Sequence, residues 1–354
     1  MEQVSHKLFT VHFFLIFILL FCIPIQGHEE DDVVNVYDRE GNHIFSSALQ
    51  LTIGDRYLSE DNYKYQIIDQ EGDRAIAKKI KKIDLKAAST ETRALNPFYA
   101  QNGEKKDDNP TVAIYHTHNG ESYIPGPVNV QGPGEIHNVG LKLGNKLKEK
   151  GINVLNSDNL HLPHDGASYT RSRVTALQLA RQGVDVILDI HRDAVPDSSE
   201  YLTSIEGEET VQVRLVVGRQ NPNRKVNEQF AYNLKAISDQ KKPGLIKDVL
   251  YGQGEYNQSL HPRSLLLEMG THKNNKDQIH RSAAMTAGLL SSLLYGEVAG
   301  KAREANSAWV NIFWILFVLI LVGTGYLYLL EGSWPGVKKR LKNFFSREII
   351  DRGE

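Results

Sequence analysis

The residues IYHTHNGESY, from Ile114 to Tyr123, place two histidines, a carboxylate and a tyrosine directly behind a short apolar run. Imidazole nitrogens and carboxylate oxygens are usual protein ligands of catalytic zinc, which keeps one further coordination position open. Two other apolar runs end in the same residue types: VDVILDI leads into His191, and RSLLLEM carries Glu268. These three run ends predict a metal-dependent hydrolytic site, provided that the fold brings them together.

A zinc site built from these groups leaves one carboxylate free for proton transfer. His118 and Glu121 are three residues apart, and His191 supplies the third ligand. Glu268 then lies outside the metal shell, where it can act as general base and general acid. Four neighbouring polar residues are predicted to support the site: His116, Arg192, Asp193 and His272.

Other interpretations of the same residues stay open. His116 and His118 alternate with Thr117, so both can face solvent at the end of a strand. The His-Arg-Asp triplet that begins at His191 can be an ion-paired turn. Glu268 is harder to explain structurally, because a buried carboxylate without a partner is costly. The other histidines of this region are expected at the surface or in a substrate cleft: His137, His161, His164 and His261.

The composition excludes several other classes of protein. The chain has 354 residues, 24% of them charged, and a formal net charge of −2 at pH 7. It contains no acidic or basic block that would indicate nucleic-acid binding. Its one cysteine, Cys22, lies in an apolar stretch, which excludes a disulfide framework, a cysteine-ligated zinc and a thiol nucleophile in the folded domain. No Gly-x-Ser-x-Gly elbow and no phosphate-binding glycine loop occurs, so serine hydrolysis and phosphoryl transfer lack support.

Strands and helices are predicted to alternate around the candidate residues. Expected strands are 111–116, 152–157, 184–190, 210–218 and 264–269, and expected helices are 134–151, 168–183, 223–240 and 277–294. This alternation predicts an α/β catalytic domain over 111–296, with a largely parallel sheet flanked by helices. Ligands bind beyond the carboxyl ends of strands in such a sheet, and there the candidate residues would meet.

Two segments precede this domain. Residues 28–83 contain short strand patterns separated by turn residues, and they predict a small β-rich module with no evident chemistry. Residues 84–110 are polar and are predicted to form a linker.

Both ends of the chain predict contact with a membrane. Residues 1–27 are expected to be a signal peptide or an N-terminal membrane anchor. Residues 309–330 carry no charge and would be about 33 Å long as a helix, enough to cross a bilayer; a buried core helix is the alternative. The basic residues of 331–354 predict a cytoplasmic tail, which places the catalytic domain at the cell membrane on the extracytoplasmic side.

Four segments together resemble the motifs of the stage II sporulation protein P family: IYHTHNGESY, SYTRSR, DIHRDA and NQSLHPRSLLLEMGTHKNN. The resemblance covers roughly residues 110–294. It implies a membrane-anchored protein that acts on peptidoglycan and is similar to the zinc-dependent N-acetylmuramoyl-L-alanine amidases. Such enzymes cut between the lactyl group of the sugar and the first alanine of the stem peptide. Endopeptidase activity on crosslinked stem peptides is also implied.

The resemblance has consequences for individual residues and for partners. It implies zinc on His118, Glu121 and His191 and a catalytic Glu268, in agreement with the chemistry of the residues themselves. It further implies, as partners, a lytic transglycosylase and a polytopic membrane protein, in a complex that drives membrane migration during engulfment. The predicted C-terminal span departs from the pattern, since an N-terminal anchor alone is expected in the sporulation members.

The sequence therefore predicts an extracytoplasmic zinc amidase of the cell wall, with a role in sporulation. Two alternatives stay open: a catalytically silent wall-binding or scaffolding module, and a zinc endopeptidase that cuts only the stem peptide. The residues alone do not separate amide from peptide hydrolysis, because both reactions pass through the same tetrahedral oxyanion.

Overall fold

The structure, a computed structural model, describes residues 33–85, 109–295 and 304–350. The predicted N-terminal segment 1–27 lies outside these residues, as does most of the predicted linker 84–110. The chain divides into two compact units, Met1–Val298 and Ala299–Glu354.

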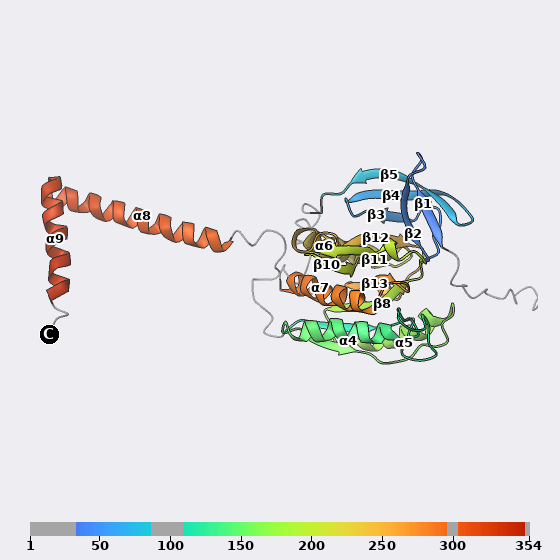
Figure 1. Ribbon diagram of the computed structural model, residues 1–354. Coiled ribbons are helices and arrows are strands. Elements are labelled where there is room, and N and C mark those ends of the chain that lie inside the picture. Colours follow the sequence, from blue (N-terminus) through green and yellow to red (C-terminus); the bar gives the residue numbers. More distant parts are fainter. Residues whose placement is uncertain (1–32, 86–108, 296–303, 351–354) are drawn as a thin grey trace, which may run out of the picture. The chain divides into compact units, whose positions relative to one another are not determined.

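An eleven-stranded sheet forms the centre of the first unit, in the order β2-β1-β5-β4-β3-β12-β11-β13-β8-β6-β7 (Figure 1). Its strands are β1 (Val34–Tyr37), β2 (His43–Ser47), β3 (Arg56–Leu58), β4 (Tyr63–Glu71), β5 (Arg74–Lys82), β6 (Thr111–Tyr115), β7 (Asn153–Asn156), β8 (Val186–Asp193), β11 (Val213–Gly218), β12 (Ile246–Gly252) and β13 (Ser264–Thr271). A separate two-stranded ribbon pairs β9 (Leu202–Ile205) with β10 (Glu208–Val211).

The predicted α/β class is confirmed, and the sheet is mixed. From β12 to β7 the neighbouring strands are parallel, except that β11 runs antiparallel to β13. The carboxyl ends of β6, β8 and β13 therefore meet at one edge of the sheet, as the sequence pattern requires. The first five strands are mostly antiparallel to one another.

Helices cover both faces of the parallel part. They are α4 (Glu135–Lys148), α5 (Ser168–Ala180), α6 (Arg224–Lys241) and α7 (Lys276–Leu294). Helix α7 packs beside both α4 and α6. Ala113 and Tyr115 of β6 pack with residues of α5, whereas Ile114 between them faces Gly140 of α4. Because alternate residues of a strand point to opposite faces, α4 and α5 lie on opposite sides of the sheet.

The strands of residues 34–82 continue the same sheet. Strand β3 pairs antiparallel with β12, where Val249 lies opposite Leu58. A shared hydrophobic core joins the two parts, since Leu250 of β12 packs with Phe45 and Tyr57. The sequence pattern did not identify β12, and this strand is the one that connects the N-terminal strands to the strands carrying the candidate site.

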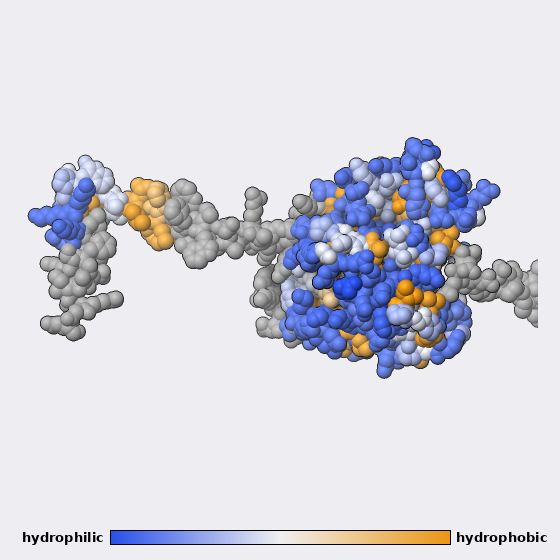
Figure 2. All heavy atoms as spheres, in the orientation of Figure 1, coloured by the Kyte–Doolittle hydropathy of each residue, from blue (hydrophilic) through white to orange (hydrophobic). Residues whose placement is uncertain are grey.

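The second unit contains the helices α8 (Glu304–Glu331) and α9 (Trp334–Ile350). Large apolar side chains are exposed on α8 from Ile315 to Leu330, and they form a hydrophobic surface (Figure 2). Within the described residues, no single helix reaches the length and hydropathy of a membrane span. Ile315–Glu331 and Trp334–Arg340, bent by 111°, reach them only as a pair.

Candidate metal centre

The three predicted strand ends meet in the structure. Strand β8 lies between β6 and β13, and Glu268 of β13 is the register partner of His191 of β8. His118 and Glu121 follow β6 in a loop that begins at His116. The loop is folded back by hydrogen bonds from Val130 N to Gly120 O, at 2.9 Å, and from Ile136 N to Glu121 O, at 3.1 Å. Residues more than 70 positions apart therefore share one site.

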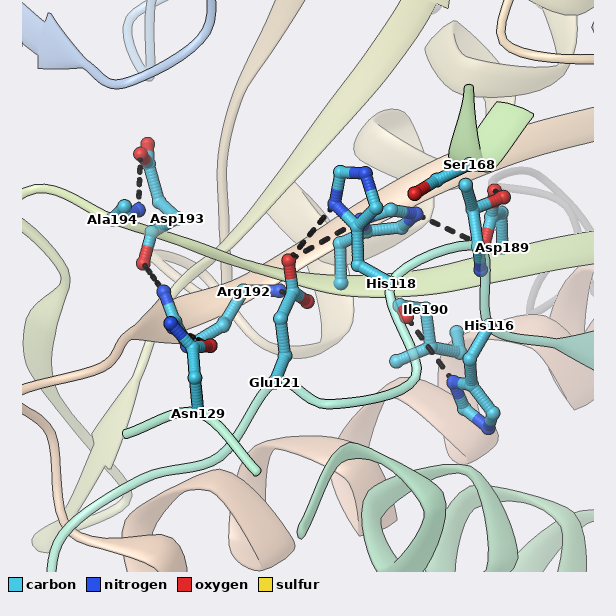
Figure 3. A network of polar contacts seen from close by, with 12 residues as sticks. His116, His118, Glu121, Asn129, Ser168, Asp189, Ile190, Arg192, Asp193 and Ala194 are labelled. Carbon is cyan, nitrogen blue, oxygen red and sulfur yellow. Dashed lines mark hydrogen bonds and ion pairs between the residues drawn. The ribbon is translucent and has the colours of Figure 1, made fainter. Parts of the chain in front are cut away.

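His118, Glu121 and His191 form a compact cluster of possible metal ligands. One ligand atom from each lies within 4.8 Å of the other two. Oε1 of Glu121 is 3.1 Å from Nδ1 of His118 and 3.7 Å from Nδ1 of His191. Figure 3 shows the Glu121 carboxylate directed at the His118 ring. The three donors thus face a common point, with two imidazoles and one carboxylate.

Neighbouring polar groups fix the orientation of two of these side chains. The second carboxylate oxygen of Glu121, Oε2, accepts a hydrogen bond from the backbone N–H of Arg192 at 3.0 Å. Nε2 of His191 lies 3.0 Å from Oδ1 of Asp189, so its Nδ1 is left to face Glu121. Asp189 is itself held by the backbone N–H and the hydroxyl of Thr117. Outer carboxylates of this kind set the orientation of histidine ligands in metal sites.

Burial and the neighbouring charges shift the pKa values of the cluster. Burial raises the pKa of Glu121, but the imidazoles of His191 and His118 outweigh it and hold the pKa well below its usual range. Burial lowers the pKa of His191, while Asp189 and Glu121 raise it well above its usual value. These two shifts favour an ion pair between the Glu121 carboxylate and the His191 imidazolium.

Glu268 lies beside this ion pair with a different protonation state. Only 3% of its surface is exposed, and burial raises its pKa to about 8, against an opposing effect of His191. The carboxylates of Asp193 and Glu121 also contribute to this rise in pKa. Within the described residues its Oε2 has no hydrogen-bond partner. A buried carboxyl group with a raised pKa and an oxygen free of hydrogen bonds is a candidate for proton transfer.

The four predicted supporting residues have separate positions. His116 points away from the cluster (Figure 3), and its Nδ1 donates to the carbonyl oxygen of Ile190 at 3.2 Å. A Cβ at Gly140 of α4 would meet the His116 ring at 2.6 Å, so the ring fills a site that only glycine leaves open. Arg192 holds the loop that covers Glu121, by donating to Asn129 Oδ1 at 2.8 Å.

Asp193 is part of a buried network, and His272 lies outside the cleft. Asp193 Oδ2 is 3.0 Å from Nη1 of Arg214 and accepts the Tyr201 hydroxyl at 2.8 Å. His272 donates its backbone N–H to the carbonyl oxygen of Asp193 at 3.3 Å. It is not among the described residues that line the cleft.

An open cleft of about 510 Å³ contains the cluster and Glu268. One side is formed by the loop before α5 and by Tyr169, whose ring lies parallel to that of His191 at 6.2 Å. His164 also lines this side and stacks on His118 at 3.9 Å; burial lowers its pKa to about 4. Ala48, Leu49 and Gln50 of the N-terminal region line the cleft as well.

The sequence interpretation omitted three groups that shape the site. Asp189 stands two residues before His191, so the Asp-x-His spacing on one face of a strand could have indicated it. In the sequence, Arg214 is one charged residue within an apolar strand, and no pattern indicates its buried ionic contacts. Residues 48–50 carry no pattern that links them to the candidate centre.

A family model and a sequence relative point to the same family. The family model described as Stage II sporulation protein P (SpoIIP) matches residues 38–291. A relative from Bacillus subtilis (strain 168), named Stage II sporulation protein P, is 29% identical over 247 residues, which cover 64% of this chain. The match spans 59% of the length of that relative.

Solved structures with a similar fold are more distant. An N-acetylmuramoyl-L-alanine amidase from Clostridium difficile 630 is 18% identical, with a TM-score of 0.35, and the match covers 52% of this chain and 97% of that one. An N-acetylmuramyl-L-alanine amidase from Mycobacterium smegmatis is 13% identical, with a TM-score of 0.35 and coverage of 53% and 98%. The family model covers most of this chain, including all the residues of the candidate metal centre, and the chain belongs to the stage II sporulation protein P family.

Proposed function

We propose that this protein is a membrane-anchored, zinc-dependent peptidoglycan hydrolase that cleaves the amide between N-acetylmuramic acid and L-alanine. The observation that carries the proposal is the cluster of His118, Glu121 and His191, with Glu268 beside it in an open cleft. Family membership supports a role in sporulation. The amide bond itself is the one that the sequence resemblance implies.

The cluster fits zinc on two grounds. Its donors are two imidazoles and one carboxylate, a set that zinc hydrolases use. Glu121 and His191 are also held from outside by Arg192 N and Asp189, so little reorganisation is needed for binding. When bound, zinc supplies a Lewis acid that polarises a carbonyl and lowers the pKa of a water molecule.

Glu268 has the position and the chemistry of a proton carrier for amide hydrolysis. Water adds to the carbonyl carbon, the C–N bond breaks, and one proton must pass from the water to the leaving amine. Glu268 can accept that proton and deliver it, because its carboxyl group is buried next to the cluster. A positive charge near Glu268 would lower the pKa of its carboxyl group from about 8. The lower pKa would favour the ionised form, which acts as a base.

The proposal includes the location of the protein and its partners. The uncharged stretch 309–330 within α8, followed by basic residues, supports a membrane anchor with a cytoplasmic tail and an extracytoplasmic catalytic region. The domain division at residues 27, 83, 110 and 296 is part of the same proposal. A lytic transglycosylase and a polytopic membrane protein of engulfment are proposed as partners on the resemblance alone.

Mass spectrometry of muropeptides tests the chemistry. Purified peptidoglycan is digested with the full chain, with the Glu268→Gln variant as the control. Free stem peptides that begin with L-alanine are the expected product. Shortened or uncrosslinked peptides still attached to sugar would identify an endopeptidase instead. Wall binding without any product, from protein that contains zinc, would identify a silent binding or scaffolding module.

A further inference from the structure

One wall of the cleft is formed by a segment of the N-terminal region that is tied down at both ends. At one end, Ala48 donates its backbone N–H to Asp193 Oδ1 at 3.0 Å, directly beside the metal centre. At the other end, Asp55 forms an ion pair with Arg219 at 3.0 Å, and Thr52 Oγ1 accepts from the same guanidinium at 3.0 Å. Arg219 follows β11, so the segment runs from the metal centre to the loop after that strand.

Three glutamines line the cleft along this wall. Gln50 belongs to the segment, Gln220 follows β11, and Gln253 follows β12. All three are exposed, and within the described residues none of their amide groups is engaged by a hydrogen bond to another residue. Each amide offers both donors and an acceptor to a ligand. These three residues are called the glutamine arm below.

The glutamine arm is uncharged, in contrast to the metal end of the cleft. The charged residues that line the cleft are Glu121, Asp165, Arg192, Asp193 and Glu268. Of these, Glu121 and Glu268 belong to the metal centre, and Arg192 and Asp193 directly follow His191 in the chain. Asp165 directly follows His164, which stacks on His118. Arg219, which precedes Gln220 in the chain, forms an ion pair with Asp55.

An aromatic ring, that of Tyr256, lines the same cleft. Tyr256 has a positive φ of 51°, uncommon for a residue with a side chain, and its ring lies 5.5 Å from that of Tyr169. Strained backbone at a cleft wall persists only where the surrounding structure holds it. An aromatic ring followed by uncharged amides suits a ligand with apolar ring faces and many hydroxyl and amide groups.

We propose that the glutamine arm binds the uncharged glycan part of the substrate, and that Gln50 and Gln253 are specificity-determining residues. This proposal rests on the proposed function and assigns one substrate component to one part of the cleft. Sugar hydroxyls and N-acetyl groups match amide donors and acceptors. Stem peptides carry carboxylates, and the arm has no cation to compensate their charge. The N-terminal segment carries no candidate catalytic residue. It would thereby position the substrate relative to the metal centre.

Binding of a neutral glycan probe tests the arm without any turnover. The probe is a hexamer of N-acetylglucosamine, titrated into the full chain in detergent, beside a free stem tetrapeptide. The double variant Gln50→Ala/Gln253→Ala should bind the hexamer about tenfold more weakly, as expected for the loss of two neutral hydrogen bonds. Affinity for the tetrapeptide should stay unchanged. Gln178→Ala, an exposed glutamine of α5 outside the cleft, is the matched control.

Two results of the binding experiment would overturn the proposal. Equal hexamer affinity in the double variant and in the control would show that the arm binds no glycan. Weaker binding of the tetrapeptide, with the hexamer unaffected, would assign the arm to the stem peptide.

Kinetics separates this proposal from the proposed function. On intact peptidoglycan the double variant should raise KM about tenfold and leave kcat within about twofold, because the hydrogen bonds it removes act on binding. On muramoyl dipeptide, which has a single sugar and fewer groups for the arm to bind, the rise in KM should be smaller. If the wild type hydrolyses no peptidoglycan but the double variant still binds the hexamer more weakly, the proposed function is wrong and the glycan proposal is unaffected. If the wild type and the double variant hydrolyse peptidoglycan with the same KM, the proposal for the glutamine arm is wrong and the proposed function is unaffected.

Discussion

Two glutamates near the same point have pKa values that are shifted in opposite directions, and this difference supports the separate roles proposed for them. Glu121 is held ionised by two imidazoles and by the backbone N–H of Arg192. Oε2 of Glu268 has no hydrogen-bond partner among the described residues, and burial raises the pKa of this carboxyl group to about 8 against an opposing effect of His191. An ionised carboxylate suits a metal ligand, whereas a carboxyl group with a pKa near neutrality suits proton transfer.

Glutamine substitutions should distinguish these two roles. Glu268→Gln preserves the shape of the side chain, so the variant should retain zinc while hydrolysis falls by roughly 10²- to 10⁴-fold. Glu121→Gln should lose both zinc affinity and activity, because a three-ligand site has no spare ligand. Zinc content by atomic spectroscopy, beside turnover, measures both effects. A metal-free Glu268→Gln protein would make Glu268 a ligand, and a fully active one would place the base elsewhere.

His116 should affect stability rather than metal binding. Burial lowers its pKa to about 3, from an ordinary value of 6.5. Between these values the unfolded chain binds a proton that the folded chain does not, so stability falls as the pH drops through this window. The loss is limited to about 1.4 kcal/mol per pH unit.

Unfolding by urea at pH 7, 6 and 5 measures this contribution. Below about pH 6.5 the wild-type protein should lose stability more steeply than His116→Gln, which lacks the titrating group. A difference between the two proteins that is independent of pH would show that His116 titrates normally. Zinc content of His116→Gln should stay close to that of the wild type.

At the scale of elements, the register between strands assembles the site. His191, Glu268, Arg214 and Asp248 are successive register partners on β8, β13, β11 and β12. They therefore lie in one row on one face of the sheet. A slip of one residue in β13 would turn Glu268 to the opposite face, so correct pairing is a condition for the proposed role of Glu268.

A buried ionic network fixes this row and the cleft wall. Arg214 is fully buried and donates two hydrogen bonds to Asp248, at 2.8 and 3.0 Å, and one to Asp193 at 3.0 Å. It also donates to the carbonyl oxygen of Ser46 at 3.2 Å, just before the wall segment begins. The guanidinium thus connects three strands with the N-terminal region.

Loss of this guanidinium should destabilise the fold strongly. Arg214→Met leaves two carboxylates buried without compensation and should lower the free energy of unfolding by about 3–5 kcal/mol. Urea unfolding monitored by circular dichroism gives the value. Arg181→Met, at an exposed position after α5, is the control and should change little. Adding Asp193→Asn and Asp248→Asn should recover part of the loss; an unchanged midpoint in Arg214→Met would contradict the network.

In the molecule as a whole, one sheet combines two stretches of sequence whose patterns predict separate domains. Residues 34–82 contribute five strands at one end of the sheet, and residues from 111 onward contribute the others (Figure 1). The N-terminal strands reach the cleft through the segment at Ala48–Gln50, so this region of the chain forms part of the cleft wall. Removal of these strands would also expose the edge of β12.

The proposed anchoring predicts the side of the membrane on which each region lies. Single cysteines at Lys105→Cys and Ser346→Cys, in a Cys22→Ser background, are labelled on intact cells with an impermeant maleimide. Labelling at position 105 is expected, and position 346 should react only after lysis, because the basic residues keep the tail inside. Labelling at position 346 alone would place the catalytic cleft away from its wall substrate and overturn the proposed topology.

Local sequence patterns were sufficient to predict which residues gather at the candidate centre and most of the elements that position them. His118, Glu121, His191 and Glu268 stand at the ends of apolar runs, and the carboxyl ends of parallel strands meet at one edge whatever else the fold contains. Local periodicity was sufficient for this, because each run carries its own pattern.

The groups that surround that centre became known from contacts in the folded chain. The direction of His116 depends on its packing against Gly140, and the role of Arg214 depends on Asp193, Asp248 and Ser46. The cleft wall at residues 48–50 depends on the pairing of β3 with β12. These contacts join residues far apart in the chain. They arise from strand register and from the need of each buried charge for a partner, so a local sequence pattern does not predict them.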